Sequence, residues 1–276
     1  MDIFENIKGS VIQHGPHNNR IYLMRLNTDD THGLIATLDD MAIKNDYGKI
    51  FAKIPAPEWN AFKSADYIKE AEVPRFFTGK TDGFFIAKYF SAERQRTHNV
   101  EKLLGFVKQA GEKSANNIHR TCKATRDVVS CQPSDTAEMS AIYQQVFKSY
   151  PFPIQKPIYL KRMMKEGVLY FCVRIEGRIA AIAAAEIDLV NKNAEMTDFA
   201  TLPKWRGMGL AGMLLSHMEK KTRKLGIKTA HTIARATSHG MNFVFKNSGY
   251  NYSELLKNNS QICGSIQSMT VWYKHI

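Results

Sequence analysis

Small residues gather in one stretch of the chain that has the character of an anion-binding site. They are Gly207, Gly209, Ala211 and Gly212. A helical pattern of apolar residues begins at Leu210, and the first N–H groups of a helix lack internal partners and carry the positive end of its dipole. Glycines let an anion approach these groups closely, and Arg206 adds a formal positive charge. We therefore expect a phosphate or pyrophosphate group to bind here.

Two ligand-binding motifs fit this stretch. Residues 207–212 match G-x-G-x-x-G, but that dinucleotide fingerprint also needs an acidic residue about 20 positions later, where the chain has 231–233, His-Thr-Ile. The other motif is Arg206-x-x-Gly209-x-Ala211, preceded by a strand and by a proline. An ordinary strand–helix corner, with glycines for tight packing, is the alternative without a ligand. No Gly-Lys-Ser/Thr follows the glycines, so a P-loop is excluded.

The elements that must position this stretch form a mixed α and β domain over residues 127–276. Apolar periodicity and turn residues predict strands over 128–132, 168–175, 179–189, 194–202 and 229–235, and two last strands around 250 and over 265–273. The predicted helices are 136–148, 158–165, 210–225 and 238–247. Their order is β-α-α-β-β-β-α-β-α-β-β.

This order and the Arg206-x-x-Gly209-x-Ala211 motif resemble the GNAT-type N-acetyltransferases over roughly residues 127–276. The resemblance implies an α+β fold with a central mixed, mostly antiparallel sheet, and acetyl-CoA as the acetyl donor. In that family the glycine turn holds the pyrophosphate, and backbone groups on the preceding strand hold the pantetheine arm. The cofactor-binding residues implied here are Thr201, Leu202, Arg206, Gly207, Met208, Gly209, Leu210, Ala211 and Ser238.

Acetyl transfer from a thioester needs a neutral amine, whereas an alkyl ammonium has a pKa of about 10. A base must therefore remove a proton, and by resemblance the best candidate is Glu195, on the strand that leads into the glycine turn. Asp198 is the second candidate. These two side chains point to opposite faces of a regular strand, so we expect only one to face the substrate. A carboxylate that merely faces solvent is the alternative for either.

The residue expected to protonate the departing thiolate differs from the family pattern. Many members have a tyrosine where this chain has Phe245, which cannot donate a proton. Tyr250 or Tyr252 could substitute, or solvent could serve. The reaction needs no metal, and the His and Cys residues show no ligand cluster.

The acceptor is suggested by a longer stretch near the end of the chain. Residues 242–274 resemble the β-lysine N-acetyltransferases, which implies a small zwitterionic diamine as substrate and β-lysine N6 as the acetylated group. Such a molecule needs carboxylates near its cationic end and hydrogen-bond donors near its carboxylate. Candidates for the first role are Glu186, Glu195 and Asp198, and for the second Arg235, Tyr252, Asn258 and Asn259. A simple loop is the alternative for the two asparagines.

Two other functions stay open at this point. Another amine, such as a protein lysine, a polyamine or an antibiotic, would keep the fold and the donor. A non-catalytic module that binds CoA or nucleic acid is the other class, suggested by Phe245 and by the net charge of +12.

The N-terminal region, residues 1–95, reads as a smaller α/β domain, and residues 96–126 as a helical linker. Residues 61–67 (AFKSADY) align with 244–250 (VFKNSGY), so this domain could be a reduced copy of the second half of the acetyltransferase domain. Chance similarity is the alternative. The copy has no glycine turn and should not bind the cofactor. It could brace the acceptor pocket or form a homodimer contact.

We expect a cytoplasmic protein, and the resemblance implies a small-molecule amine as its substrate. The 276 residues are 44% hydrophobic, without a long apolar run or an evident secretion signal. Four scattered cysteines suggest reduced thiols. The lysines and arginines are spread along the chain, so we expect a solvated basic surface, with no nucleic-acid or membrane partner.

Overall fold

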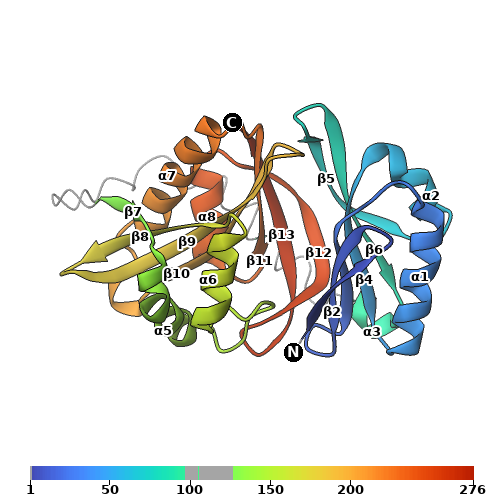
Figure 1. The fold of residues 1–276 in the computed structure, drawn as a ribbon, viewed down its shortest axis with the longest axis horizontal. Coiled ribbons are helices and arrows are strands. Elements are labelled where there is room, and N and C mark those ends of the chain that lie inside the picture. The colour runs from blue at the N-terminus through green and yellow to red at the C-terminus, as the bar shows by residue number, and fades with distance from the viewer. Residues whose placement is uncertain (1, 97–104, 106–126) are drawn as a thin grey trace.

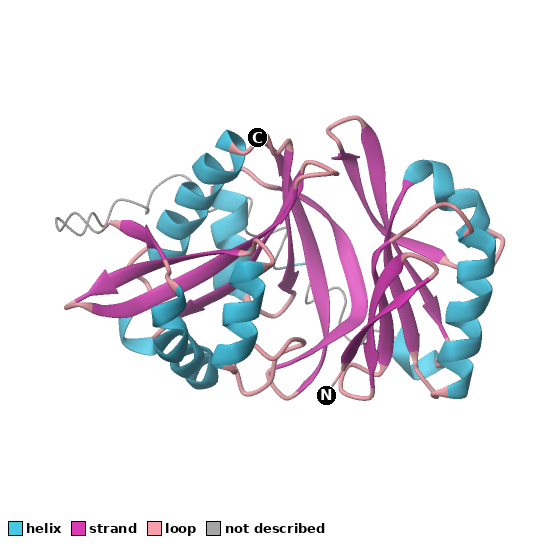
Figure 2. Ribbon diagram, viewed as in Figure 1, coloured by secondary structure: helices cyan, strands magenta, loops and turns pink. Residues whose placement is uncertain are grey.

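The computed structural model describes residues 2–96, 105 and 127–276, which form two lobes, each built around one β-sheet (Figure 1). Most of the predicted linker, residues 96–126, lies outside the described residues. The N-terminal lobe contains one sheet and the C-terminal lobe the other. Figure 2 shows that helices lie on the outer side of the N-terminal sheet, whereas its other side faces the C-terminal lobe.

The N-terminal lobe has a six-stranded sheet in the order β1-β2-β3-β4-β6-β5. Its strands are β1 (Ile3–Ile7), β2 (Ser10–Gly15), β3 (Arg20–Arg25), β4 (Lys49–Pro55), β5 (Ile68–Phe77) and β6 (Thr81–Tyr89). Its helices are α1 (Thr31–Lys44), η1 (Ala56–Glu58), α2 (Trp59–Lys63) and α3 (Ala92–Gln95). Only β3 and β4 pair in parallel, and the other pairs are antiparallel.

The C-terminal lobe has a seven-stranded sheet in the order β12-β13-β11-β10-β9-β8-β7. Its strands are β7 (Val128–Ser130), β8 (Leu169–Ile175), β9 (Arg178–Asp188), β10 (Asn193–Thr201), β11 (Thr229–Arg235), β12 (Asn251–Ile262) and β13 (Ser265–His275). Its helices are η2 (Pro133–Asp135), α5 (Thr136–Val146), α6 (Pro157–Lys165), η3 (Pro203–Trp205), α7 (Leu210–Lys224) and α8 (His239–Asn247). The predicted order of elements and the mixed, mostly antiparallel sheet are confirmed.

The two lobes share one topology. Read from its other edge, the C-terminal sheet runs β7-β8-β9-β10-β11-β13-β12, and without the extra edge strand β7 this order matches the N-terminal sheet strand for strand. In each lobe one α-helix connects the two parallel strands, α1 between β3 and β4 and α7 between β10 and β11. The aligned segments also agree in detail, because Phe62 and Tyr67 pack edge to face at 5.1 Å and Phe245 and Tyr250 at 5.3 Å.

The equivalent helices differ at their N-termini. The carboxylate of Asp30 caps α1 by accepting a hydrogen bond from the Gly33 N–H at 2.9 Å, and Lys8 pairs with the same carboxylate. By contrast, α7 begins after Gly209 without a side-chain cap. An anion therefore finds the N-terminus of α1 already occupied by a carboxylate.

Alternation along the strands divides the apolar side chains between three cores. In the N-terminal sheet, Tyr22 and Phe51 face the C-terminal lobe, whereas Ile21 and Ile50 pack under α1. In the C-terminal sheet, one face packs against α7 and α8. The other face, with α5 and α6, shares its core with the N-terminal lobe. The two lobes thus have a common hydrophobic core.

Polar contacts hold the N-terminal lobe against β12, the edge strand of the C-terminal sheet. Lys49 is fully buried, pairs with Glu70 at 2.7 Å, and donates to the Lys257 carbonyl at 2.7 Å. The other oxygen of Glu70 accepts from the Lys257 N–H at 2.9 Å. Ser253 Oγ donates to the carbonyl of Glu72 at 2.7 Å. An edge strand that would otherwise expose unpaired backbone groups is thereby covered.

Strands β1 and β2 were missed by the sequence analysis. β1 is largely exposed, and β2 contains buried polar residues that break the apolar alternation. These residues make contacts with partners far along the chain. Gln13 donates to the Pro151 carbonyl at 2.9 Å, and His14 contacts the Tyr47 hydroxyl at 3.0 Å. Periodicity cannot detect a strand whose burial depends on such partners.

Replacing Glu70 with Gln should lower the free energy of unfolding by about 3–5 kcal/mol, because Lys49 would stay buried without a carboxylate. Glu72→Gln is the matched control, since Glu72 forms an exposed pair with Lys69 and should change stability by less than about 1 kcal/mol. Urea unfolding of both variants measures the difference. Equal effects would contradict the assigned role of the buried pair.

Candidate active site

Strands β10 and β11 separate in the middle of the C-terminal sheet. They pair in parallel only from Asn193 with Thr229 to Glu195 with His231. Beyond that point β11 continues to pair with β13 on its other side, and β10 with β9. A gap therefore opens between two strands of one sheet, and the Glu195–His231 pair lies at its closed end.

A β-bulge on β10 places two acids on the same cavity. The register with β9 shifts between Thr197 and Ala200, and Asp198 has a φ of 55°. Glu195 and Asp198 therefore both line the cavity, although a regular strand would turn them to opposite faces. We expected only one of them to face the substrate, but both side chains reach this cavity because the bulge redirects Asp198. Aspartate is among the few non-glycine residues that adopt this conformation readily.

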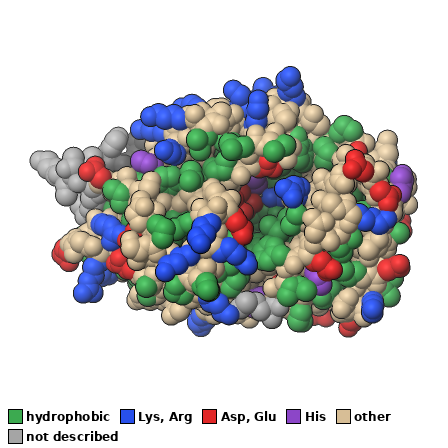
Figure 3. Space-filling view, viewed as in Figure 1, with side chains coloured by type: hydrophobic (Ala, Val, Ile, Leu, Met, Phe, Trp, Pro, Cys, Tyr) green, Lys and Arg blue, Asp and Glu red, His purple; other side chains and the backbone are tan. Residues whose placement is uncertain are grey.

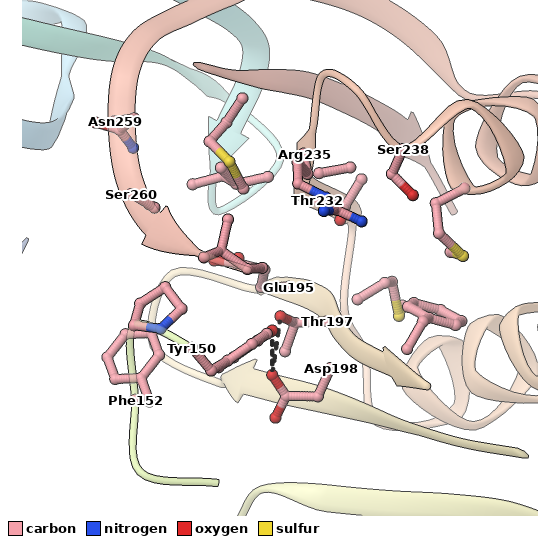
Figure 4. A pocket seen from close by; sticks show the side chains of 18 of the residues that line it. Tyr150, Phe152, Glu195, Thr197, Asp198, Thr232, Arg235, Ser238, Asn259 and Ser260 are labelled. Carbon is pink, nitrogen blue, oxygen red and sulfur yellow. Dashed lines mark hydrogen bonds between the residues drawn. The ribbon is translucent and has the colours of Figure 1, made fainter. Parts of the chain in front are cut away.

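The cavity lies between the separated strands and the N-terminal lobe. Its walls come from β10, β11, the loop after α5, the start of α8, β12, and β3 and β4 of the N-terminal lobe. Figure 3 shows the surface hollowed between the lobes, with hydrophobic side chains in the hollow and charged ones at its rim. In Figure 4, Asn259 and Ser260 lie at one side of the cavity and Arg235 and Ser238 at another.

Glu195 is held in the ionised form by two neighbours. Lys53 of the N-terminal lobe lies 3.5 Å from its carboxylate, and Nε2 of His231 lies 3.3 Å from the same oxygen. Burial alone would raise the pKa of Glu195, but the positive charge of Lys53 and the contact with His231 lower it well below its usual range. The pKa of His231 is lowered by burial, and its ring packs edge to face on Phe76 at 4.8 Å.

Asp198 and Glu186 are more basic than ordinary carboxylates. Burial raises the pKa of Asp198 to about 6, although the Tyr150 hydroxyl, which donates to it at 2.7 Å, partly opposes this shift (Figure 4). Burial, together with the negative charges of Glu195 and Asp198, raises the pKa of Glu186. The cavity thus contains one firmly ionised carboxylate and two that bind protons near neutral pH.

The glycine turn meets the requirements of a pyrophosphate site. Gly207 and Gly209 have φ angles of 77° and 75°, and a Cβ built on either would contact nothing within 4 Å. No side chain caps α7, no acid lies in its first turn, and the exposed Arg206 is close by, donating to the Thr201 carbonyl at 3.3 Å. Leu210 is buried in the core, whereas Ala211 is half-buried. Met208 lies in the turn between the two glycines.

Thr201 and Leu202, the two predicted pantetheine contacts, differ in whether their backbone N–H groups are already hydrogen-bonded. The Leu202 N–H donates to the Ala180 carbonyl at 3.0 Å, and its own carbonyl accepts from Trp205. Neighbouring residues of a strand direct their backbone groups to opposite edges, so the N–H of Thr201 points toward β11 and the gap. The arrangement leaves Thr201, rather than the N–H of Leu202, directed toward a ligand between the strands.

The predicted catalytic and acceptor-binding residues divide into two groups. Those that line the cavity are Glu186, Glu195, Asp198, Arg235 and Asn259, together with Ser238 from the predicted cofactor residues. The other three catalytic or acceptor-binding residues are not among its lining residues. Tyr250 is buried against Phe245, and the half-buried Tyr252 packs on Trp272. The side chain of Asn258 donates to the carbonyls of Arg94 and Arg96. Asn258 therefore ties the two lobes together.

The sequence analysis missed several lining residues because they lie in the N-terminal lobe. These are Arg20, Tyr22, Met24 and Phe51, and Lys53 joins them through its contact with Glu195. The alternation of β3 predicts that Arg20 and Tyr22 share one face of the strand. The sequence does not indicate which part of the protein this face packs against. His231 was passed over for lack of a recognisable motif.

Two classes of feature are not found in the part of the chain that the structure describes. No group of three or more His, Cys, Asp or Glu side chains is arranged to hold a metal ion. None of the described helices has both the length and the apolar character needed to cross a bilayer.

Known proteins resemble this chain in sequence. The acetyltransferase (GNAT) family model matches residues 136–250. Beta-lysine N(6)-acetyltransferase of Methanococcus maripaludis is 35% identical over 277 residues, which cover 99% of each chain. N-acetyltransferase YodP of Bacillus subtilis is 28% identical, covering 99% of this chain and 100% of that protein. Beta-lysine N(6)-acetyltransferase of Methanosarcina mazei is 28% identical over 82% of this chain and 90% of that protein.

The relative from M. maripaludis extends over both lobes, so the similarity includes the N-terminal lobe as well as the acetyltransferase fold. The separated strands, the uncapped α7 and the acidic cavity are consistent with acyl transfer to an amine. The chain belongs to the GNAT family of N-acetyltransferases.

Proposed function

We propose that this protein transfers the acetyl group of acetyl-CoA to the N6 amine of β-lysine, forming Nε-acetyl-β-lysine. The observation that carries the proposal is the buried cavity lined by Glu186, Glu195 and Asp198, which suits a cationic amine. The 35% identity to a β-lysine N(6)-acetyltransferase over 99% of both chains supports this acceptor.

The donor fits the elements around the gap. Gly207, Gly209 and the first N–H groups of α7 would hold the pyrophosphate, and Arg206 would add charge. The pantetheine arm would lie between β10 and β11, within reach of the Thr201 backbone. Ser238, which precedes α8 and lines the cavity, would contact the same arm. The thioester would then lie beside the bulge at Asp198.

Asp198 is the better of the two candidate bases. A general base works best when its pKa lies near the working pH, and the pKa of Asp198 is about 6. Glu195 is paired with Lys53, and its lowered pKa makes it a weak proton acceptor. We assign proton removal to Asp198, and to Glu195 the attraction of the ammonium group.

The chemical step is a direct attack. Asp198 takes one proton from the ammonium group, and the neutral amine then forms a C–N bond with the thioester carbon. The C–S bond breaks, and the nitrogen loses its second proton to solvent as the amide forms. Phe245 has no proton to donate, and Tyr250 is not among the residues that line the cavity. We therefore assign protonation of the CoA thiolate to solvent.

Purified protein incubated with acetyl-CoA and β-lysine should release free thiol well above the rate without amine. Mass spectrometry should locate the acetyl group on N6. Thiol release with spermidine or a lysine-containing peptide, but not with β-lysine, would reject the acceptor and keep the reaction class.

The pH dependence of Glu195→Gln distinguishes the two bases. If Asp198 is the base, the rate climbs as pH rises through about 6 in the wild type, because Asp198 must be ionised. The charge of Glu195 raises the pKa of Asp198, so Glu195→Gln should move the climb to lower pH. If the rate of Glu195→Gln instead rose only at higher pH, toward the amine pKa of about 10, Glu195 would be identified as the base. Asp198→Asn should lower kcat by about 10²–10⁴-fold.

Gly209→Ala should raise the KM for acetyl-CoA, because a side chain at a φ of 75° strains the turn by about 1–2 kcal/mol and displaces the N–H groups that hold the anion. Gly226→Ala is the matched control, with a φ of 82° and equally open surroundings at the other end of α7. Steady-state kinetics should show a raised KM only for the first variant. Equal KM values in the two variants would argue against a pyrophosphate at this turn.

A further inference from the structure

Arg20 is a buried cation in the cavity wall with no acidic partner. It begins β3 of the N-terminal lobe, is 3% exposed, and lines the cavity that contains Glu195 and Asp198. Among the ion pairs of the described residues, none includes Arg20. A buried charge is costly unless it is paired, so this arrangement calls for an anion.

Neutral groups orient Arg20 without cancelling its charge. Nη1 donates to the carbonyl oxygen of Asn259 and to Oγ of Ser260, the latter at 3.0 Å. Nε is buried and has no hydrogen-bond partner among the described residues. The guanidinium carbon lies 5.1 Å from the ring centre of Tyr22 and 5.8 Å from that of Phe51. The guanidinium is thus fixed in orientation, and its Nε–H is still without a hydrogen-bond acceptor among the described residues.

The cavity consequently has two ends of opposite character. Arg20 is bonded to Asn259 and Ser260, which Figure 4 places away from Asp198, with Glu195 between them. An acceptor with a carboxylate at one end and amines along its chain matches this order of charges.

We propose that Arg20 binds the carboxylate of the acceptor, so that the N-terminal lobe selects amino acids over plain diamines. This inference rests on the proposed function, because it requires an amine acceptor that carries a carboxylate. A guanidinium offers a fork of N–H donors that matches the two oxygens of a carboxylate. The carboxylate would pair with Arg20 while the N6 amine reaches Asp198 and the 3-ammonium lies near Glu195.

Two other arginines are less suited to this role. Arg235 also lines the cavity, but it is only half-buried, and Figure 4 places it beside Thr232 near Ser238, where the donor would bind. Arg94 is 6% exposed, but it donates to the carbonyls of Asn258 and Asn18 and is not among the lining residues. Arg94 therefore provides a matched control for removing a buried arginine next to β12.

The test compares β-lysine with 1,4-diaminopentane, which is β-lysine without its carboxylate. The wild type should prefer β-lysine. Arg20→Met should raise the KM for β-lysine about 10–100-fold, as expected for lost charge-assisted hydrogen bonds, and leave the KM for 1,4-diaminopentane within about threefold. Arg20→Lys, which keeps the charge but not the fork, should restore part of the preference. Arg94→Met should leave the preference unchanged, whatever it does to stability.

Urea unfolding confirms that each variant is folded before its kinetics are compared. An Arg20→Met protein that keeps the preference, or one in which both KM values rise equally, would overturn the inference. So would loss of the preference in Arg235→Met alone. A wild type inactive with β-lysine would reject the proposed function, and lysine against 1,5-diaminopentane then makes the same comparison. Activity with diamines but with neither amino acid would overturn both.

Discussion

The separation of β10 from β11 is the constraint on which the rest of the site depends. Because the two strands stop pairing after Glu195 and His231, one sheet has a gap in its middle, and backbone groups there remain available to a ligand. The bulge on the same strand turns Asp198 into that gap. Both irregularities interrupt a regular ladder, and their cost is offset by the extensive pairing of β9, β11 and β13 around them.

The N-terminal lobe completes the site. The cationic side chain of Lys53 lies against Glu195, Phe76 packs on His231, and Arg20 forms part of the cavity wall. One hydrophobic core, which includes Phe76, runs through both lobes beside these contacts. They also separate the acids by function, since the cation beside Glu195 keeps it ionised while burial leaves Asp198 able to exchange protons near neutral pH.

Much of the C-terminal lobe could be predicted from sequence. The glycine turn, the amphipathic α7 and the order of strands depend on local signals, namely small residues, helical spacing and turn residues. The bulge at Asp198 could not be predicted, because an unpaired residue depends on the register with β9. The same limit applied to Lys53 and Arg20, which become site residues only through packing of one lobe on the other. Tyr250 was predicted as a site residue from its chemistry, but it is buried in the core beneath α7 and α8 and does not line the cavity.

The chain uses one topology twice, but of the two equivalent helices only α7 begins without a side-chain cap. In the N-terminal copy, Asp30 supplies internally the negative charge that a helix N-terminus attracts, and Lys8 reinforces it. In the proposed function, the C-terminal lobe would therefore hold the nucleotide and the N-terminal lobe would contribute to acceptor choice. On that proposal the stoichiometry should be one donor molecule per polypeptide despite the repeated topology, and substitutions in the N-terminal lobe could change acceptor choice without altering the glycine turn.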